Sequence, residues 1–467
     1  MDPRPAIAGR SGTAVRLALS LLLLLGACTP GGDGNGEDDA TEIRSPSRSR
    51  PNVLLIITDD QRIGSLSVMP NLRKWFRRDG TEFQPGFVTT PLCCPSRASI
   101  FSGKYMHNHG VTTNREARAL DLERTSQSFL HEAGYRTGHV GKFLNGWPPS
   151  LDPPFLDYYV ISSGSPYHEG TWNLNGRERQ LDTYSTTFIG QRSLRFLKRA
   201  SETDDPWFLT IAVTAPHSPA EPEARYENSP VPHWRGNPAA VLDDLAGKPP
   251  FLGLGSPNLP AARAVREGQL RTLMSVDDLI GRVRRQLERS GDLENTLAFF
   301  ISDNGILWQE HGIINKTLPY TSSVQVPFFM SWPASGVPIG TDDRLAANID
   351  IAPTILDAAD IEGEPFASMD GRSLLRRWRR KELLLEYQVY RVFDTPSWAS
   401  LRTREGQFIQ YRNEAGKVRF EEYYDVGEDP WQLENLLATQ DLNNDIDVKD
   451  LRRRLERYRR CVGRECP

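Results

Sequence analysis

Four short runs that predict strands recur along this chain, and polar side chains follow each of them. The runs cover residues 52–58, 135–140, 207–213 and 296–302. The first, third and fourth are continuous apolar, β-branched runs of the kind expected for strands that are buried on both faces of a mostly parallel sheet. The carboxyl ends of such strands meet at one edge, which is where open α/β sheets bind their ligands. We therefore expect the polar residues that follow the runs to meet in one site.

The segments between these runs read as helices. The residue pattern predicts helices over 67–78, 126–133, 187–199 and 263–289, and a further strand over 324–332. This alternation predicts an α/β fold, with a large mixed, mostly parallel sheet sandwiched by helices. The paired acids Asp277 and Asp278 fall inside the last helix. We expect them to serve packing or the polar face of that helix and not to bind a metal.

Acidic and amide side chains follow two of the predicted strands. Asp59 and Asp60 come directly after the first run, and Asp303 and Asn304 come after the fourth. Burying two adjacent carboxylates costs free energy unless they form ion pairs or bind a cation. Carboxylate and amide oxygens are ligands that suit Ca²⁺ or Mg²⁺. The sequence thus predicts a hard-cation site, with a plain solvated turn as the alternative for the acidic pair.

The other two strands end near a lysine and a histidine. Lys142 closes the second strand, where it could reach a bound anion, and His217 follows the third. A single lysine is usually solvated, and an isolated histidine is usually structural. Their placement at the same predicted sheet edge as the acids is what makes them candidates.

The stretch Cys93-Cys94-Pro95-Ser96-Arg97 predicts a short helix with Cys93 at its N-terminus. Proline is tolerated in a first helical turn, and Gly103 suits the end. Backbone N–H groups and the positive end of the helix dipole favour an anion there, and they lower the pKa of a thiol. Arg97 is placed to bind that anion bidentately. A buried structural pair of cysteines, or a disulfide elsewhere, is the alternative interpretation.

The run Cys-x-Pro-Ser-Arg, followed by a small residue and a glycine, resembles the signature of the type I sulfatases of the alkaline-phosphatase superfamily. The longer stretch 93–111 includes Gly103-Lys104-Tyr105 and His107-Asn108-His109. It is most similar to the branch of N-acetylglucosamine-6-sulfatases and heparan-sulfate 6-O-endosulfatases. The resemblance covers nearly all of residues 51–467 and implies an alkaline-phosphatase-like fold.

This resemblance implies roles for individual residues. A formylglycine-generating enzyme is expected to oxidise Cys93 to formylglycine, whose hydrated aldehyde is the nucleophile. The resemblance also implies one bound Ca²⁺, and Mg²⁺ fits less well. The expected ligands of this ion are Asp59, Asp60, the modified Cys93, Asp303 and Asn304. The sulfate-binding and leaving-group residues are expected to be Arg97, Lys142, His217 and Lys316. His107 and His311 are expected to contact the substrate.

The predicted function is that of a sulfuric ester hydrolase acting on a sulfated carbohydrate. The resemblance indicates a 6-O-sulfated, glucosamine-type sugar of a glycosaminoglycan-like polymer. A phosphodiester or phosphonate monoester hydrolase of the same superfamily is one alternative. Another alternative is a catalytically silent surface lipoprotein that binds glycans. The presence of the complete residue set argues against it: Cys93, Arg97, Lys142, His217 and Lys316. The long loops in 146–190 and 218–263 are expected to shape the pocket.

The first 27 residues predict an export signal. Arginines precede an apolar core over 17–25 that is too short to span a bilayer. Leu25-Gly26-Ala27-Cys28 resembles a bacterial lipobox, so we expect cleavage before Cys28, lipidation of Cys28 and a flexible tether over 28–50. The protein would then be exported as a periplasmic or cell-surface lipoprotein anchored to the membrane. An ordinary signal peptide with a chance cysteine is the alternative.

Charge disfavours nucleic acid as a partner. The chain carries a formal net charge of −4, and loss of residues 1–27 removes three arginines and one aspartate, which leaves −6. An anionic polymer must therefore be bound by a local basic pocket.

The C-terminal part carries two of the five cysteines. With Cys28 assigned to lipid and Cys93 to chemistry, Cys461 and Cys466 are left for a small-loop disulfide, as in the resembling 6-sulfatases, and Cys94 stays free. Residues 51–375 are expected to form the catalytic domain and 376–467 a smaller α+β subdomain. Its antiparallel sheet and terminal helix are predicted at 383–390, 400–403, 407–411, 422–425 and 447–460.

Overall fold

The computed structural model describes residues 50–242, 244–253, 257–438 and 446–467. The predicted signal peptide, the lipidation site Cys28 and the tether up to residue 49 lie outside the described residues. Within the described residues, no helix has the length and apolar character needed to cross a membrane.

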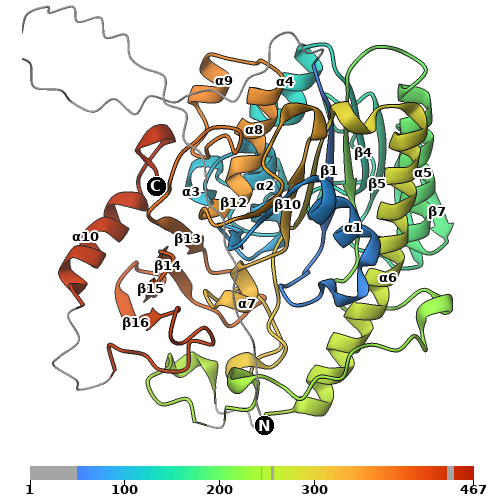
Figure 1. The fold of residues 1–467 in the computed structure, drawn as a ribbon. Coiled ribbons are helices and arrows are strands. Elements are labelled where there is room, and N and C mark those ends of the chain that lie inside the picture. The colour runs from blue at the N-terminus through green and yellow to red at the C-terminus, as the bar shows by residue number, and fades with distance from the viewer. Residues whose placement is uncertain (1–49, 243, 254–256, 439–445) are drawn as a thin grey trace, which may run out of the picture. The chain divides into compact units, whose positions relative to one another are not determined.

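A ten-stranded mixed sheet forms the centre of the fold (Figure 1). In spatial order its strands are β11 (Gly340–Asp342), β2 (Thr81–Phe83), β10 (Phe328–Ser331), β9 (Thr296–Ser302), β1 (Asn52–Thr58), β8 (Trp207–Ala212), β4 (Arg136–Lys142), β5 (Tyr158–Ser162), β6 (Glu169–Leu174) and β7 (Glu178–Asp182). The central strands β9, β1, β8, β4 and β5 are parallel to one another. The pairs β10–β2, β10–β9, β5–β6 and β6–β7 are antiparallel. The four predicted buried strands therefore lie side by side, and their carboxyl ends meet at one edge.

Helices cover both faces of this sheet, as predicted (Figure 1). One face packs against α1 (Pro70–Asp79), α5 (Ser185–Ala200) and α6 (Leu259–Ser290). The other packs against α2 (Cys93–Ser102), α4 (Ser126–Glu132) and α8 (Ile351–Ala358). The side chains of β1 alternate between these two cores, with Val53, Leu55 and Ile57 in one and Leu54 and Ile56 in the other. Burial on both faces explains why the sequence of this strand is apolar throughout.

Asp277 has the packing role that its sequence position predicts. Its carboxylate accepts hydrogen bonds from the backbone N–H groups of Asn71 and Leu72, at 3.0 and 2.9 Å. These groups belong to the first turn of α1, where helix N–H groups have no partner within the helix. The acid therefore joins α6 to the start of α1.

The strand predicted over 324–332 is shorter than expected. Residues Thr321–Val324 form a helical turn, α7, and β10 begins only at Phe328. Pro327 precedes the strand and has no N–H group to donate, and the pairing of β10 with β9 and β2 starts after it. The predicted loop-rich stretch 146–190 also holds β5, β6 and β7, and Asn175 and Gly176 form the expected hairpin turn with φ of 50° and 80°.

The C-terminal part forms a separate antiparallel sheet. Its strands are β13 (Leu383–Tyr387), β14 (Ser397–Arg402), β15 (Gly406–Arg412) and β16 (Val418–Asp425), and α10 (Val448–Tyr458) packs against it. A disulfide joins Cys461 and Cys466, and Cys94 is a free, buried thiol. This sheet shares a hydrophobic core with Phe87, Leu92 and Tyr105 from the N-terminal half. The domain boundary at residue 375 remains a prediction.

Short elements complete the described fold. They are β3 (Gly86–Phe87), which pairs with β12 (Ala346–Ala347), and the helical turns α3 (Met106–His109) and α9 (Glu364–Ala367).

Candidate active site

The acidic pair lies at the carboxyl end of β1, inside the molecule. Asp59 is fully buried and Asp60 nearly so. Asp60 adopts a positive φ of 66°, and its backbone N–H donates to Asp303 Oδ1 at 3.2 Å. Asn304 donates from Nδ2 to Asp60 Oδ1 at 2.6 Å. The ends of β1 and β9 therefore bring together all four predicted oxygen-bearing side chains.

Cys93 faces this acidic group from the N-terminus of α2. Its Sγ lies 3.5 Å from Asp59 Oδ1 and 4.0 Å from Asp60 Oδ1. Helix α2 begins at Cys93 and is closed by Gly103, which has a φ of 67°, as the sequence predicts. The helix therefore directs the Cys93 side chain to the carboxyl edge of the central sheet.

Arg97 and Lys142 bind the acids from a second side. The Nε atom of Arg97 lies 2.8 Å from Asp303 Oδ2, and Lys142 Nζ lies 2.5 Å from Asp59 Oδ2. Arg97 also donates from Nη1 to the carbonyl oxygen of Lys142 at 2.7 Å. Its Nη2 is buried and, among the described residues, has no hydrogen-bond partner. Its nearest carboxylate oxygen is Asp59 Oδ2 at 3.9 Å, so this nitrogen keeps a hydrogen-bonding position that is suited to an anion.

Gly141 is what allows Lys142 to reach the cluster. The glycine has a φ of 116°, and a Cβ at this position would lie 1.8 Å from the carbonyl oxygen of Ala212. Strand β4 therefore approaches β8 so closely at this point that only glycine fits.

Lys316 and His217 approach from two loops. Lys316 Nζ lies 2.5 Å from Asp60 Oδ1 and 2.9 Å from Cys93 Sγ. His217 Nε2 lies 3.8 Å from Asp60 Oδ2, and 29% of its side chain is exposed. The side chain of His217 is far more exposed than the side chains of Lys142 and Lys316, so His217 borders solvent.

The protonation states follow from burial and from these ion pairs. Burial alone would raise the pKa of Asp59, but Lys142 and the other nearby cations lower it well below the usual range. For Asp303, burial and the neighbouring Asp59 carboxylate raise the pKa. The lowered thiol pKa expected at the start of a helix is wrong for Cys93, because burial raises the pKa of this thiol to about 12. An unmodified Cys93 would therefore be a neutral thiol at neutral pH, and a weak nucleophile.

The cluster fits a divalent cation by its donor chemistry. Ligand atoms of Asp59, Asp60, Cys93 and His217 lie within 4.8 Å of one another. Asn304 Oδ1 is buried and has no hydrogen-bond partner among the described residues. Carboxylate and amide oxygens are the ligands that Ca²⁺ prefers. The three aspartates balance Arg97, Lys142 and Lys316 in charge, so a divalent cation would leave the site positive and ready for an anion.

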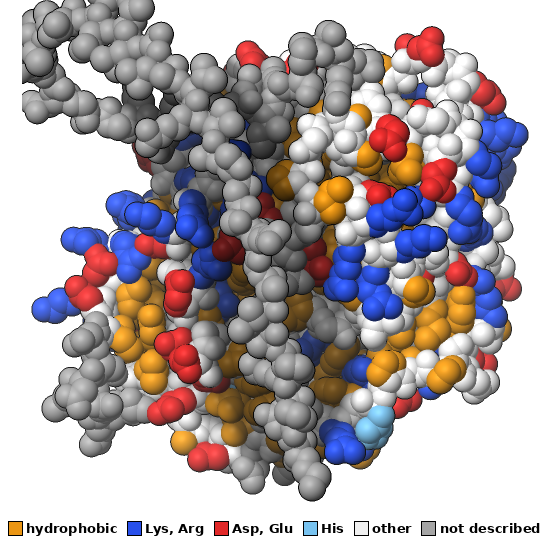
Figure 2. All heavy atoms as spheres, viewed as in Figure 1, with side chains coloured by type: hydrophobic (Ala, Val, Ile, Leu, Met, Phe, Trp, Pro, Cys, Tyr) orange, Lys and Arg blue, Asp and Glu red, His pale blue; other side chains and the backbone are white. Residues whose placement is uncertain are grey.

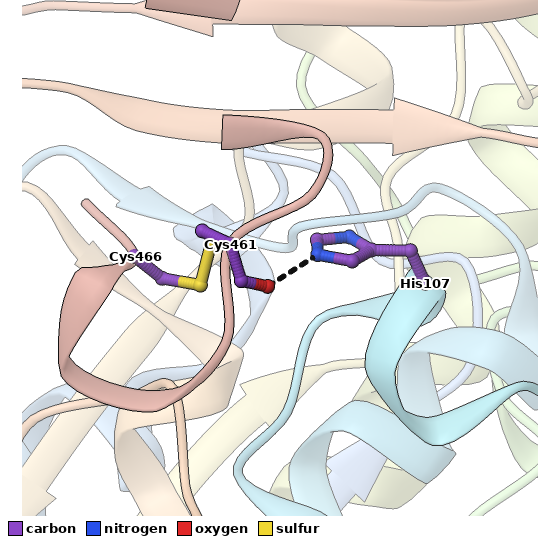
Figure 3. Close-up of side chains that lie close together, drawn as sticks. All are labelled: His107, Cys461 and Cys466. Atoms are coloured by element: carbon purple, nitrogen blue, oxygen red, sulfur yellow. Dashed lines mark hydrogen bonds between the residues drawn. A yellow bond between two sulfur atoms is a disulfide. The ribbon is translucent and has the colours of Figure 1, made fainter. Parts of the chain in front are cut away.

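The two histidines expected to contact substrate have protein partners instead. His107 Nδ1 lies 2.9 Å from Glu386 Oε1, and its Nε2 lies 3.0 Å from the carbonyl oxygen of Cys461 (Figure 3). The ring of His311 lies 4.2 Å from that of Tyr320, and burial and Lys248 hold its pKa well below the usual range. Their substrate-binding role stays a prediction. The sulfurs beside His107 are bonded to each other, so this group is not a metal site in the oxidised protein.

Sequence reasoning missed one residue of the cluster. Ser165, in the loop between β5 and β6, lies with its Oγ 3.3 Å from Asp59 Oδ2. A single serine in a loop-rich stretch carries no pattern that distinguishes it. Only the return of that loop to the end of β1 reveals its position.

Comparisons with known proteins agree with this geometry. The family model Sulfatase matches residues 51–361, and the model of the C-terminal part of N-sulphoglucosamine sulphohydrolase matches residues 309–461. A Sulf-1 homologue of Caenorhabditis elegans is 36% identical over 355 residues, which are 70% of this chain and 49% of the relative. Human N-acetylglucosamine-6-sulfatase is 30% identical over 84% of this chain and 82% of its own length. The chain thus spans about half the length of the first relative and most of the second.

Solved structures share the fold. A protein solved in complex with its substrate, D-glucosamine-2-N,6-O-disulfate, superposes with a TM-score of 0.76. The match covers 87% of this chain and 97% of that chain, at 23% sequence identity. At this level of identity, the likeness supports the predicted sheet-and-helix architecture.

Proposed function

Because this chain belongs to the sulfatase family, we propose that it removes sulfate from the 6-O position of a glucosamine-type sugar. The observation that carries the proposal is the buried cluster in which Cys93, three aspartates and three cations meet at the carboxyl edge of the sheet. A glycan-binding protein without activity would not need this arrangement. The 6-O position is supported by the similarity to N-acetylglucosamine-6-sulfatase.

In this proposal Cys93 is converted to formylglycine by a formylglycine-generating enzyme. The modified residue supplies a hydrated aldehyde hydroxyl as the nucleophile towards sulfur. The raised pKa of the thiol supports this role, since an unmodified Cys93 would not ionise near neutral pH. Lys316 is 2.9 Å from Sγ and would hold the nucleophilic group by a charge-assisted hydrogen bond.

Ca²⁺ is the metal we propose, held by Asp59, Asp60, Asp303, Asn304 and the modified Cys93. When bound, such a cation polarises a sulfate oxygen and neutralises negative charge. Arg97 and Lys142 pair with Asp59, and Lys316 pairs with Asp60, so all three cations border these acids and would stabilise charge on the sulfuryl oxygens in the transition state. These contacts are fixed before substrate arrives, because all three cations are already held by buried carboxylates.

His217 is the proposed general acid. It borders solvent beside Asp60 and is therefore placed to give a proton to the sugar oxygen that leaves. A sugar oxygen that leaves sulfur as an alkoxide requires such a proton, whereas a phenolate does not. Loss of a proton from the remaining hydroxyl of the modified Cys93 would then release sulfate.

We also propose that the protein is exported and held on a bacterial membrane by lipid at Cys28. The apolar core of residues 17–25 followed by Leu25-Gly26-Ala27-Cys28 supports this, and the disulfide between Cys461 and Cys466 fits an oxidising compartment. Replacing Cys28 with serine should release the protein from the membrane fraction. Unchanged membrane attachment would contradict the anchor.

Two measurements test the proposed function. The mass of the tryptic peptide 79–97, from protein made in its native cell, should show an aldehyde in place of the Cys93 thiol. The same protein should hydrolyse glucosamine 6-sulfate and aryl sulfates faster than an aryl phosphodiester. An active protein with an unmodified Cys93 would overturn the nucleophile, and a preference for the phosphodiester would favour the phosphodiester or phosphonate monoester alternative.

A further inference from the structure

The segment 447–467 is basic, although the chain as a whole is negative. It contains α10 and the disulfide loop, and it holds eight basic against four acidic side chains, whereas the whole chain is negative at −4. Such a local excess of positive charge on a negative protein is a candidate binding surface for an anion.

The basic side chains point away from the core. Leu451 and Leu455 of α10 are buried in the core that α10 shares with the small sheet. The other side of the segment presents six exposed basic residues, which we call the α10 basic surface: Lys449, Arg452, Arg453, Arg457, Arg460 and Arg464. Figure 2 shows blue side chains gathered over α10, with a few acidic ones among them. Arg453 and Arg460 are 80% and 77% exposed.

Carboxylates pair with three of the six residues: Arg452 with Glu421, Arg453 with Asp450 and Arg460 with Glu456. Glu456 is shared by three guanidinium groups, those of Arg412, Arg459 and Arg460. Among the described residues, no carboxylate forms an ion pair with Lys449, Arg457 or Arg464. Exposed ion pairs contribute little to stability, so this many arginines are not explained by folding.

The shape of the surface indicates an extended ligand. From Lys449 to Arg460 the chain rises along a helical path of about 16 Å, which is longer than a single sulfate or sugar ring. Arginine binds sulfate bidentately, and five of the six residues are arginines. A polymer with repeated sulfate groups fits a row of this kind.

A membrane surface fits less well. Amphipathic helices that lie on lipid insert an apolar face among the headgroups. The apolar face of α10 is already buried by the protein, through Leu451 and Leu455. The exposed face is polar apart from the neighbouring Val462, which is 61% exposed.

The surface has a fixed position relative to the catalytic helix. The carbonyl oxygen of Cys461 accepts hydrogen bonds from Asn108 Nδ2 and from the ring of His107 (Figure 3). Both residues lie on α3, which follows α2 and Cys93 closely in the chain. The disulfide loop therefore holds the end of α10 against the catalytic half of the molecule.

We propose that the α10 basic surface is a docking site for a sulfated polysaccharide, separate from the catalytic cluster. This rests on the proposed function, because it makes the substrate a polymer that is held at one place and desulfated at another. Small sulfate esters have no need of the surface. Docking by charge should weaken steeply with salt.

The test uses the quadruple variant K449A/R453A/R457A/R464A. A control variant, R195A/K198A/R285A/R289A, removes four exposed basic residues from α5 and α6. Heparin binding is measured over a series of salt concentrations, with Cys93→Ala added to every protein so that nothing is turned over. We expect the α10 variant to bind heparin about tenfold or more weakly, with a salt dependence reduced by roughly one ion for each basic side chain that is removed. The control should bind like the parent protein.

Activity separates docking from catalysis. With Cys93 intact, the α10 variant should keep the parent kcat/KM on an aryl sulfate and lose kcat/KM on a sulfated polysaccharide. Unchanged heparin affinity in the α10 variant overturns the docking site, whatever the activity. Loss of binding to vesicles of anionic phospholipid, with heparin binding retained, overturns it in favour of a membrane surface. The two proposals can also fail separately. If the parent protein hydrolyses no sulfate ester, while the α10 variant binds heparin more weakly than the parent, the proposed function is overturned and the docking site is supported.

Discussion

The ammonium group of Lys316 lies 2.9 Å from the Cys93 sulfur and 2.5 Å from Asp60 Oδ1. One lysine thus links the proposed nucleophile to a proposed metal ligand. Burial opposes its charge, but the Asp60 carboxylate raises the pKa of Lys316 well above the usual range. Lys316 therefore stays protonated at neutral pH, and it acts as a fixed positive charge.

Replacing Lys316 with methionine should remove that charge and keep the length of the side chain. We expect kcat/KM on an aryl sulfate to fall by about 10²–10³, the usual cost of losing one group that stabilises a transition state. The control is Lys198→Met on the exposed side of α5, which should leave activity unchanged. Circular dichroism and the mass of peptide 79–97 show whether the variant is folded and modified. A folded, modified variant with near-normal activity would sink the assignment.

Replacing His217 with glutamine should affect substrates unequally. A sugar needs a proton as it leaves, so kcat/KM on glucosamine 6-sulfate should fall by about 10²–10⁴. On 4-nitrophenyl sulfate, whose leaving group needs no proton, the fall should stay below about tenfold. The control is His131→Gln, an exposed histidine on α4. Equal losses on both substrates would show that His217 has another role.

The central strands and the site they carry could be predicted because the pattern is strong. A strand covered on both faces is apolar throughout, as in β1 and β9, so the polar residue that ends it stands out. Parallel strands then place Asp59, Lys142 and Asp303 at one edge without any knowledge of the loops. The start of α2 at Cys93 followed from Pro95 and Gly103 in the same way.

Other features depend on tertiary contacts that leave no local pattern. Ser165 reaches Asp59 only because the loop between β5 and β6 returns to the end of β1. Val324, the first residue of the strand expected over 324–332, ends a helical turn instead, because its backbone N–H donates to the carbonyl oxygen of Tyr320. The positive φ of Asp60 is likewise set by its bond to Asp303, from a strand far away in the sequence.

The buried His109 predicts how stability depends on pH. Its Nδ1 accepts a hydrogen bond from the N–H of Val111, and its Nε2 lies 3.0 Å from Ser99 Oγ, so the ring is neutral. Burial lowers the pKa of His109 from 6.5 to about 3. Between these values the unfolded chain binds a proton that the folded chain does not. Stability should therefore fall as the pH drops below 6.5, by about 1.4 kcal/mol per pH unit from this group.

Urea unfolding at pH 7, 6 and 5 checks this prediction with His109→Gln. Glutamine has no proton to gain, so the stability difference between wild type and variant should shrink as the pH falls. The exposed His131→Gln variant should follow wild type at each pH. A difference that stays constant from pH 7 to pH 5 would contradict a neutral, buried His109.

Calcium should stabilise the folded protein, since the proposed ligands come together only in the folded chain. A ligand that binds the folded state alone adds about 2.7 kcal/mol to the free energy of unfolding at a hundred times its Kd. We expect Ca²⁺ to raise the Tm of protein stripped with a chelator, and Mg²⁺ to raise it less. Asn304→Ala removes the buried Oδ1 that has no protein partner among the described residues, so this variant should lose most of the rise.

The matched control for the calcium measurement is Asp277→Asn, a buried acid outside the site. It should lower Tm, because Asp277 accepts the N–H groups of Asn71 and Leu72, yet the rise with Ca²⁺ should be that of wild type. An equal rise in Asn304→Ala and Asp277→Asn would mean that the cation binds elsewhere. The absence of a rise in wild type, together with full activity after chelation, would exclude the metal from the proposed mechanism.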